Sequence, residues 1–575
     1  MDYKPEVLSE IREYQNERIE VIFRKAAPVD VPEARYPGFK PGSTILTKGY
    51  LHKEGALPLP TDILFERDVP VTLRDGTVLY TDVFRPVGGT NLPAIIAWSP
   101  YGKEKGMTHL DDFPGRAGVP QSAVSELQKW EGPDPAYWCS HGYAIINPDS
   151  RGAYSSNGDI QAFGGQDGRD GSDVVEWVAA QDWSNGKIAF SGNSWLAVSQ
   201  WFIAAEQPPH LAAIAPWEGL CDQYREDVAR GGIPNAEFCA WVIQRMRGKN
   251  RVEDVPAMLR KYPLMNGYWE DKRAKLEKIE VPAYVVASWT SGIHTHGTFD
   301  GFRRISSKDK WLRIHNTQEW PDYYTPENVE DLRRFFDRYL KGIENGWEKT
   351  PRVRLSVLDP GGVDQVNRSE NEFPLRRAQY KSLYLDAATG TLSPDPVPEQ
   401  SEIRYKADDG QGQAAFTIRF YEDTELTGYM KLRLWIEASG ANDADLFAVV
   451  QKLDEQGNIL SPLVWNMPTP VPAGRLRVSH RELDESRSTV SEPFHTHRRE
   501  QLLIPGQIVP VDIGFWPVSM LWHKGQQLRL IVAGCDLAPM PLLGINPIVT
   551  RNKGEHIIHT GGKFDSHLIA PKIPR

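Results

Sequence analysis

Cysteine is scarce in this chain, and long apolar runs are missing from it. The four cysteines among 575 residues are scattered and form no C-x-x-C pair, which excludes a disulfide framework and a cysteine zinc site. We expect buried free thiols in a reducing compartment. No run approaches the ~18 apolar residues of a membrane span, and Met1–Glu6 lacks the basic and apolar regions of a signal peptide. The sequence therefore predicts a cytoplasmic protein without a membrane span.

The chain also lacks a net positive charge and the usual cofactor-binding motifs. The formal net charge of −10 argues against nucleic acid or an anionic membrane as a general partner. The glycine pairs at 164–165 and 231–232 follow neither P-loop nor dinucleotide-binding spacing. Three acids, Asp167, Asp170 and Asp173, lack the spacing of a calcium loop, so we expect them to interact with a helix dipole. The histidine pairs at 495/497 and 556/559 lack a third ligand. No cofactor and no metal are predicted.

What the chain does contain is an alternation of short apolar runs and helix-period segments. The runs at 93–102, 143–149, 188–190, 210–216, 281–289 and 310–315 predict strands of a parallel sheet with helices on both faces. The alternation stops between residues 219 and 280, where we expect an inserted helical cap. After residue 351, period-two patterns separated by turns predict an all-β, jelly-roll-like sandwich.

These patterns divide the chain into four parts. Residues 1–61 form an N-terminal arm, in which 8–25 predict a charged helix. Residues 62–218 and 281–350 form the α/β domain, residues 219–280 the cap, and residues 351–575 the β-sandwich.

The stretch from Lys187 to Trp201 predicts a nucleophile. It begins with a strand, turns sharply at Gly192, Asn193 and Ser194, and continues as a helix. This is the context of a nucleophile elbow, in which a strained turn exposes the serine hydroxyl and needs small neighbours. Gly192 supplies one small neighbour, whereas Leu196 stands where a second glycine is usual.

A nucleophilic serine needs a base, an orienting acid and oxyanion donors, and in such sheets these lie beyond the carboxyl ends of strands. Tyr101 follows one strand and could donate its hydroxyl, while the backbone N–H of Trp195 would be the second donor. His315 follows the last strand and fits the base, with His294 as its rival. Glu218 could be the acid that fixes the imidazole tautomer.

Several stretches together resemble the cocaine-esterase-like branch of the X-prolyl dipeptidyl-peptidase hydrolases. They include Val71–Thr77, Ser99–Lys103, the elbow, Phe335–Gly342 and Gly474–Arg481. The resemblance runs from about residue 62 to the end. It implies an α/β-hydrolase domain with a helical cap and a jelly-roll domain, acting on esters or amides through an acyl-enzyme. It also implies an oxyanion hole formed by the Tyr101 hydroxyl and the Trp195 N–H.

The chain departs from that family at the acid and the base. The family's aspartate position is Ser291 here, and the family's histidine position is Glu319. The short N-terminal arm does not resemble the helical domain with which full-length X-prolyl peptidases read the substrate's amino terminus.

Two hypotheses of different class follow. The first is a serine hydrolase with a rebuilt triad of Ser194, His315 or His294, and Glu218, acting on a small or medium ester or amide enclosed by the tryptophan-containing cap. The second is a non-hydrolytic or ligand-binding member of the same fold, suggested by the missing aspartate and histidine. The sequence leaves open whether the chain forms a homodimer.

Overall fold

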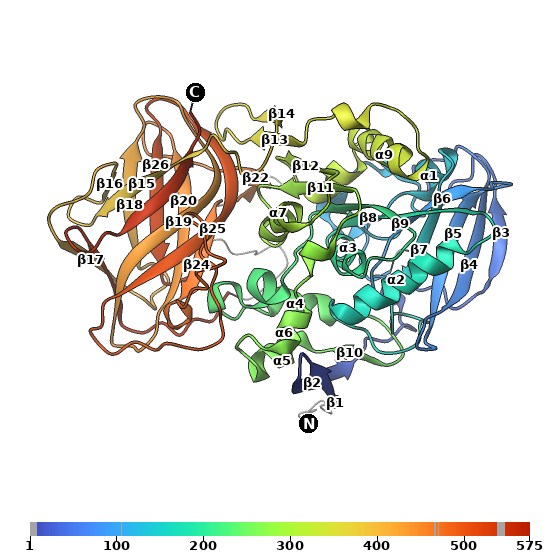
Figure 1. The fold of residues 1–575 in the computed structure, drawn as a ribbon, viewed down its shortest axis with the longest axis horizontal. Coiled ribbons are helices and arrows are strands. Elements are labelled where there is room, and N and C mark those ends of the chain that lie inside the picture. Colours follow the sequence, from blue (N-terminus) through green and yellow to red (C-terminus); the bar gives the residue numbers. More distant parts are fainter. Residues whose placement is uncertain (1–7, 105, 465–466, 470, 538–546, 575) are drawn as a thin grey trace.

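A computed structural model describes residues 8–104, 106–464, 467–469, 471–537 and 547–574. Figure 1 shows two bodies side by side: a sheet with helices, on the right, and a strand-rich C-terminal part, on the left. Short helices of the cap, in green, lie below and between them. No helix of the described residues has both the length and the apolar character needed to cross a membrane.

The first body is built on an eleven-stranded sheet in the order β14-β13-β12-β11-β9-β8-β6-β7-β5-β4-β3. Neighbours from β7 through β13 pair in parallel, and both outer edges pair antiparallel. The predicted parallel sheet is therefore present. Its strands are β3 (Gly42–Leu46), β4 (Ile63–Thr72), β5 (Val78–Pro86), β6 (Leu92–Ile96), β7 (Ala144–Asp149), β8 (Ser184–Asn193), β9 (Leu211–Trp217), β11 (Ala283–Ser288), β12 (Lys310–His315), β13 (Val353–Val357) and β14 (Gln365–Glu370).

Helices connect these strands and cover the sheet. The central strands are buried along their whole length, as expected when helices lie on both faces. The helices are α1 (Pro135–Ser140), α2 (Gly165–Ala179), α3 (Trp195–Ala205), α7 (Thr295–Arg304), α8 (Glu319–Tyr324) and α9 (Pro326–Leu340).

The N-terminal arm is not the helix predicted for residues 8–25. It is a hairpin of β1 (Leu8–Tyr14) and β2 (Glu17–Lys25). Gln15 and Asn16 form its two-residue turn with φ of 46° and 73°, the left-handed pair that matches strand twist in hairpins. Ile19, Val21 and Phe23 are buried at period two, which was the strand signal hidden among the charges.

The cap contains several short helices and one strand. The strand, β10 (Arg251–Glu253), pairs with β2 and so ties the arm to the cap. The helical elements are a π-helix at Gln223–Val228, a 3-10 turn at Arg230–Gly232, α4 (Glu237–Ile243), α5 (Val255–Lys261) and α6 (Gly267–Asp271).

The second body is a strand-rich sheet in the order β17-β27-β19-β25-β24-β20-β26-β18-β16-β15-β28, with β28 also pairing with β19. Its strands on this path are β15 (Gln379–Asp386), β16 (Thr391–Ser393), β17 (Ser401–Lys406), β18 (Gln413–Arg419), β19 (Thr424–Ser439), β20 (Asp445–Leu453), β24 (Ala473–Arg477), β25 (Val509–Trp522), β26 (Gln527–Ala533), β27 (Glu555–Thr560) and β28 (His567–Lys572). The jelly-roll connection stays a prediction.

The transition between the bodies differs in one respect from the sequence expectation. Strands β13 and β14, which lie beyond residue 351, extend the first sheet rather than the second. Period-two patterning identifies them as strands but carries no information about the sheet that they join.

Candidate active site

Ser194 stands on a sharp turn between β8 and α3. Its backbone has φ 54° and ψ −122°, a strained conformation for a residue with a side chain. Its N–H donates to the Glu218 carbonyl oxygen at 2.9 Å, which fixes the turn to the end of β9. At Gly192, a Cβ atom would lie 2.5 Å from Leu196 Cδ2. The one glycine of this elbow thus makes room for the leucine that replaces the second.

The Tyr101 hydroxyl lies beside the Ser194 side chain and the Trp195 backbone N–H. Burial raises the pKa of Tyr101 well above its usual value, and the negative charges of Glu131 and Glu319 add to that rise. The phenol therefore keeps its proton at neutral pH and can donate it in a hydrogen bond. The structure brings together the serine and both of the oxyanion donors expected from the sequence.

His315 and Glu218 also come together. His315 Nε2 lies 2.6 Å from Glu218 Oε1, and both side chains are buried. The other ring nitrogen, Nδ1, is occupied by Thr317, whose N–H donates to it at 3.3 Å and whose hydroxyl lies 3.2 Å away. Both imidazole nitrogens thus have partners other than Ser194. His315 also lies outside the wall of the cavity that Ser194 lines.

His294 lines the same cavity as Ser194. Its Nδ1 is buried without a hydrogen-bond partner among the described residues, and its Nε2 lies 4.0 Å from Glu319 Oε2. Burial lowers the pKa of His294 to about 3, so the ring is neutral at pH 7. Its backbone N–H donates to the hydroxyl of Ser291, which is the position where the resemblance expects an aspartate.

Three carboxylates line this cavity: Glu131 and Glu218, which are buried, and Glu319, which is partly buried. Burial raises the pKa of Glu319 well above its usual value, and Glu218 and Glu131 raise it further. Burial and the charge of Glu218 raise the pKa of Glu131 to about 8. The hydrogen bond that Trp320 Nε1 donates to Glu131 at 2.8 Å lowers this pKa but does not offset the rise. Like charges this close do not all ionise at neutral pH, so the group holds a proton near the nucleophile.

The sequence missed Glu131. It lies in the loop Trp130-Glu131-Gly132-Pro133 between β6 and β7, away from the carboxyl-end positions inspected for catalytic groups. Its carbonyl oxygen accepts the N–H of Asn193 at 3.2 Å, so this loop lies directly against the elbow.

The cavity has a volume of about 910 Å³ and is enclosed by three parts of the chain. The loops and helix ends of the first body supply the polar side chains described above, among them Ser194, His294 and Glu319. The cap supplies Phe238, Trp241 and Val242 from α4, and the C-terminal body supplies Phe447 and Trp516. Aromatic side chains of α4 therefore form part of the wall, and so do side chains of the strand-rich body.

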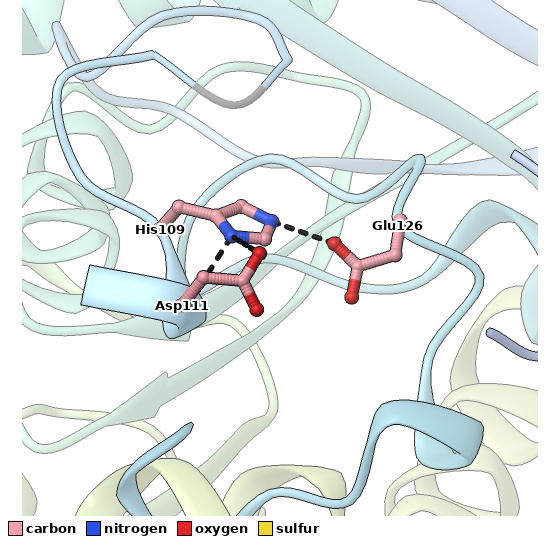
Figure 2. Close-up of side chains that lie close together, drawn as sticks. All are labelled: His109, Asp111 and Glu126. Atoms are coloured by element: carbon pink, nitrogen blue, oxygen red, sulfur yellow. Dashed lines mark hydrogen bonds and ion pairs between the residues drawn. The ribbon is translucent and has the colours of Figure 1, made fainter. Parts of the chain in front are cut away.

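One cluster near this cavity has the composition of a metal site. Figure 2 shows His109 between Asp111 and Glu126, with one ring nitrogen facing each carboxylate. His109 Nε2 lies 2.7 Å from Glu126 Oε2, and Arg116 contacts both acids. Burial by itself raises the pKa of Glu126, but the contacts with His109 and Arg116 outweigh burial and lower this pKa to about 2. Since the chain's own cations already neutralise these carboxylates, we interpret the cluster as an ion-pair network.

Comparison with known proteins bears on the whole chain. The sequence model of the X-Pro dipeptidyl-peptidase (S15) family matches residues 75–318, and that of the X-Pro dipeptidyl-peptidase C-terminal non-catalytic domain matches residues 345–569. The cocaine esterase of Rhodococcus sp. is 23% identical over 611 residues, which cover 88% of this chain and 98% of the esterase.

Solved structures agree with these matches. A CocE/NonD family hydrolase from Staphylococcus aureus has a TM-score of 0.87 and 35% identity, covering 93% of this chain and 97% of that protein. An α-amino acid ester hydrolase shares the fold, with a TM-score of 0.65 and 15% identity over 89% of this chain and 96% of its own. The α/β-hydrolase fold, the strand-rich C-terminal domain and the resemblance predicted from the sequence are confirmed, and this chain is a serine hydrolase of the CocE/NonD family.

Proposed function

We propose that this hydrolase cleaves an ester or amide bond of a small or medium organic molecule through an acyl-enzyme on Ser194. The observation that carries the proposal is the strained serine with the Tyr101 hydroxyl beside it, facing a cavity of about 910 Å³. Ser194 Oγ attacks the carbonyl carbon. The Tyr101 hydroxyl and the Trp195 N–H stabilise the oxyanion, each by roughly 3 kcal/mol.

We propose His294 as the base, in preference to His315. His294 lines the cavity and its Nδ1 has no hydrogen-bond partner within the part of the chain that the structure describes, whereas both ring nitrogens of His315 have partners. In this assignment Nδ1 takes the proton of Ser194 and later returns it to the leaving group. The pair of His315 and Glu218 then has a supporting role, because Glu218 also accepts the N–H of Ser194 through its carbonyl oxygen.

Glu319 is the acid in this scheme. Its carboxylate lies 4.0 Å from His294 Nε2 and has an unpartnered oxygen among the described residues. When ionised, Glu319 favours the tautomer of His294 that carries its proton on Nε2, which leaves the Nδ1 lone pair free for Ser194, and its charge stabilises the imidazolium that forms. The family's histidine position would thus carry the acid, and the base would come from the start of α7, three residues after the family's aspartate position.

The remaining part of the proposal concerns the enclosure of the substrate. The aromatic residues of α4 face the cavity and fit an apolar acyl or aryl group. For the C-terminal body we retain a jelly-roll-like arrangement, which the antiparallel pairing of its long strands supports.

Fluorophosphonate labelling followed by intact-protein mass spectrometry tests this function. Wild type should gain one adduct, and Ser194→Ala, checked for folding by circular dichroism, should gain none. An adduct requires a nucleophilic serine with a working base. If folded wild type gains no adduct, the acyl-enzyme proposal is wrong and a ligand-binding or non-hydrolytic role takes its place.

A further inference from the structure

Two arginines from different parts of the chain line the cavity that contains Ser194. Arg230 belongs to the 3-10 turn of the cap, and Arg475 belongs to β24 of the C-terminal body. The two segments touch directly, since a Cβ atom on Gly231 would lie 2.1 Å from the Arg475 carbonyl oxygen. Both arginines also line a neighbouring cavity of about 400 Å³, so they stand between the two spaces.

Within the described residues, neither guanidinium forms an ion pair with a carboxylate. Arg230 donates to the Ala473 carbonyl oxygen and stacks 3.9 Å from the centre of the Trp516 ring. The Nε of Arg475 is buried and has no hydrogen-bond partner there. A buried donor without a partner is costly, and folded proteins satisfy nearly all of them.

Neighbouring arginines differ in this respect. Around the second cavity, each of three arginines has its own carboxylate: Arg225 with Asp222 at 2.9 Å, Arg303 with Glu492 at 2.7 Å, and Arg304 with Asp300 at 2.9 Å. Arg487, which also lines the second cavity, stacks on Phe494 and has no ion pair within the described residues, but unlike Arg230 and Arg475 it does not line the cavity of Ser194.

The electrostatic environment leaves the pair under-compensated. Burial lowers the pKa of Arg230 well below its usual value, and the charge of Arg475 lowers it further, against Asp536 and Glu226. Burial likewise lowers the pKa of Arg475, while the negative charges of Asp536 and Asp227 act in the opposite direction and raise it. The charges of the nearby acids offset part of the cost of burying the two cations.

We propose that Arg230 and Arg475 bind an anionic oxygen group, a carboxylate or a phosphate, on the substrate. This proposal rests on Ser194 being the nucleophile in the same cavity. Guanidinium groups bind both anions through paired, charge-assisted hydrogen bonds. Phe238, Trp241 and Trp516 line the same cavity, and their aromatic side chains would hold an apolar segment of the substrate. The favoured substrate is thus an ester or amide with an apolar chain that ends in an anion.

A series of p-nitrophenyl half-esters tests the carboxylate arm. The acyl groups run from succinate to sebacate, and the matched neutral substrates are their methyl esters. Wild type should prefer the charged member by tenfold or more in kcat/KM at one chain length at least. The double variant Arg230→Gln, Arg475→Gln should lower that ratio tenfold or more, and the double lysine variant should keep part of it. Arg376→Gln, at a side chain that is 88% exposed, should leave the ratio unchanged.

Monoalkyl phosphates and alkyl carboxylates of matched length, used as inhibitors of neutral-ester hydrolysis, distinguish the two anions. Stronger inhibition by one of them in wild type, lost in the double glutamine variant, identifies the preferred group. Neutral-ester hydrolysis with no charge preference at any length, and no inhibition by either anion, would overturn the inference even if the arginine variants do not fold.

Calorimetric binding of the half-esters to Ser194→Ala separates this inference from the proposed function. If wild type hydrolyses no ester but the anionic ligands still bind more tightly than their methyl esters, the function proposal fails and the anion site stands. If esters are hydrolysed and charge makes no difference to binding, the anion site fails and the function stands.

Discussion

His294 and His315 should respond to alanine substitution in opposite ways. His294→Ala removes the only ring nitrogen available to Ser194 in our assignment, and loss of the base in a serine triad costs on the order of 10⁴-fold or more in kcat. Its Nδ1 has no partner to lose among the described residues, so the free energy of unfolding should change little from hydrogen bonding. Activity should fall while stability is largely kept.

His315→Ala should do the reverse. It removes the partner 2.6 Å from the buried Glu218 carboxylate, and an uncompensated buried charge costs about 3–5 kcal/mol. With an unfolding entropy of about 2.1 cal/mol/K per residue, cooperative unfolding of the whole chain corresponds to about 1.2 kcal/mol/K, so the melting temperature should fall by about 2–4 °C. Glu218→Gln is the matched control, because its amide oxygen still accepts from the imidazole and its loss of stability should be smaller.

The assays are p-nitrophenyl butyrate turnover, normalised to the concentration of folded protein, and thermal unfolding followed by circular dichroism. The assignment predicts a large drop in kcat for His294→Ala, and for His315→Ala a change in kcat per folded molecule of less than about tenfold. If folded His315→Ala is inactive and His294→Ala keeps full turnover, the base is His315 and our reasoning from the cavity wall is refuted.

Three further predictions concern the same region. Tyr101→Phe should lower kcat by about 10²–10³-fold with little change in KM, and an unchanged kcat would remove the hydroxyl from the oxyanion hole. Glu131→Gln removes a negative charge that raises the pKa of Glu319. Because activity needs ionised Glu319 and is lost as pH falls through that pKa, the acid limb of kcat/KM should move to lower pH; a limb that stays or moves to higher pH contradicts the role of Glu319. Asp322→Asn leaves Arg313 buried without its 2.9 Å partner and should cost about 3–5 kcal/mol in urea unfolding, while a loss below 1 kcal/mol would show that the ion pair adds little.

Much of the fold follows from the sequence because its signals are local. The run from Ile188 to Phe190 is buried on both faces, and such continuous apolar runs separated by helical periods identify a parallel sheet. The helix predicted for the arm was wrong, because the charged residues around Ile19, Val21 and Phe23 suggested a helix and only the pairing with β1 and β10 selects the strand.

The site residues likewise fall into those that local sequence signals predict and those that depend on the folded structure. That Ser194, Tyr101 and Trp195 lie together could be predicted, because a strained turn and a strand end fix where each group points. The choice between His294 and His315 could not be made, since it depends on which ring faces a cavity. Arg230 and Arg475 lie 245 positions apart in the chain. No local sequence pattern could predict that they would meet, or that neither would form an ion pair with a described carboxylate.

The cavity wall contributed by the C-terminal body has a consequence for synthesis on the ribosome. Ser194 precedes Arg475 by 281 residues, so at about 5–20 residues per second the elbow emerges roughly 15–60 s before β24 does. A nascent catalytic domain can therefore form its strained turn while one side of the future cavity is still open to water. Substrate selection is the last property that this polypeptide acquires, and it arrives together with the strands that complete the enclosure.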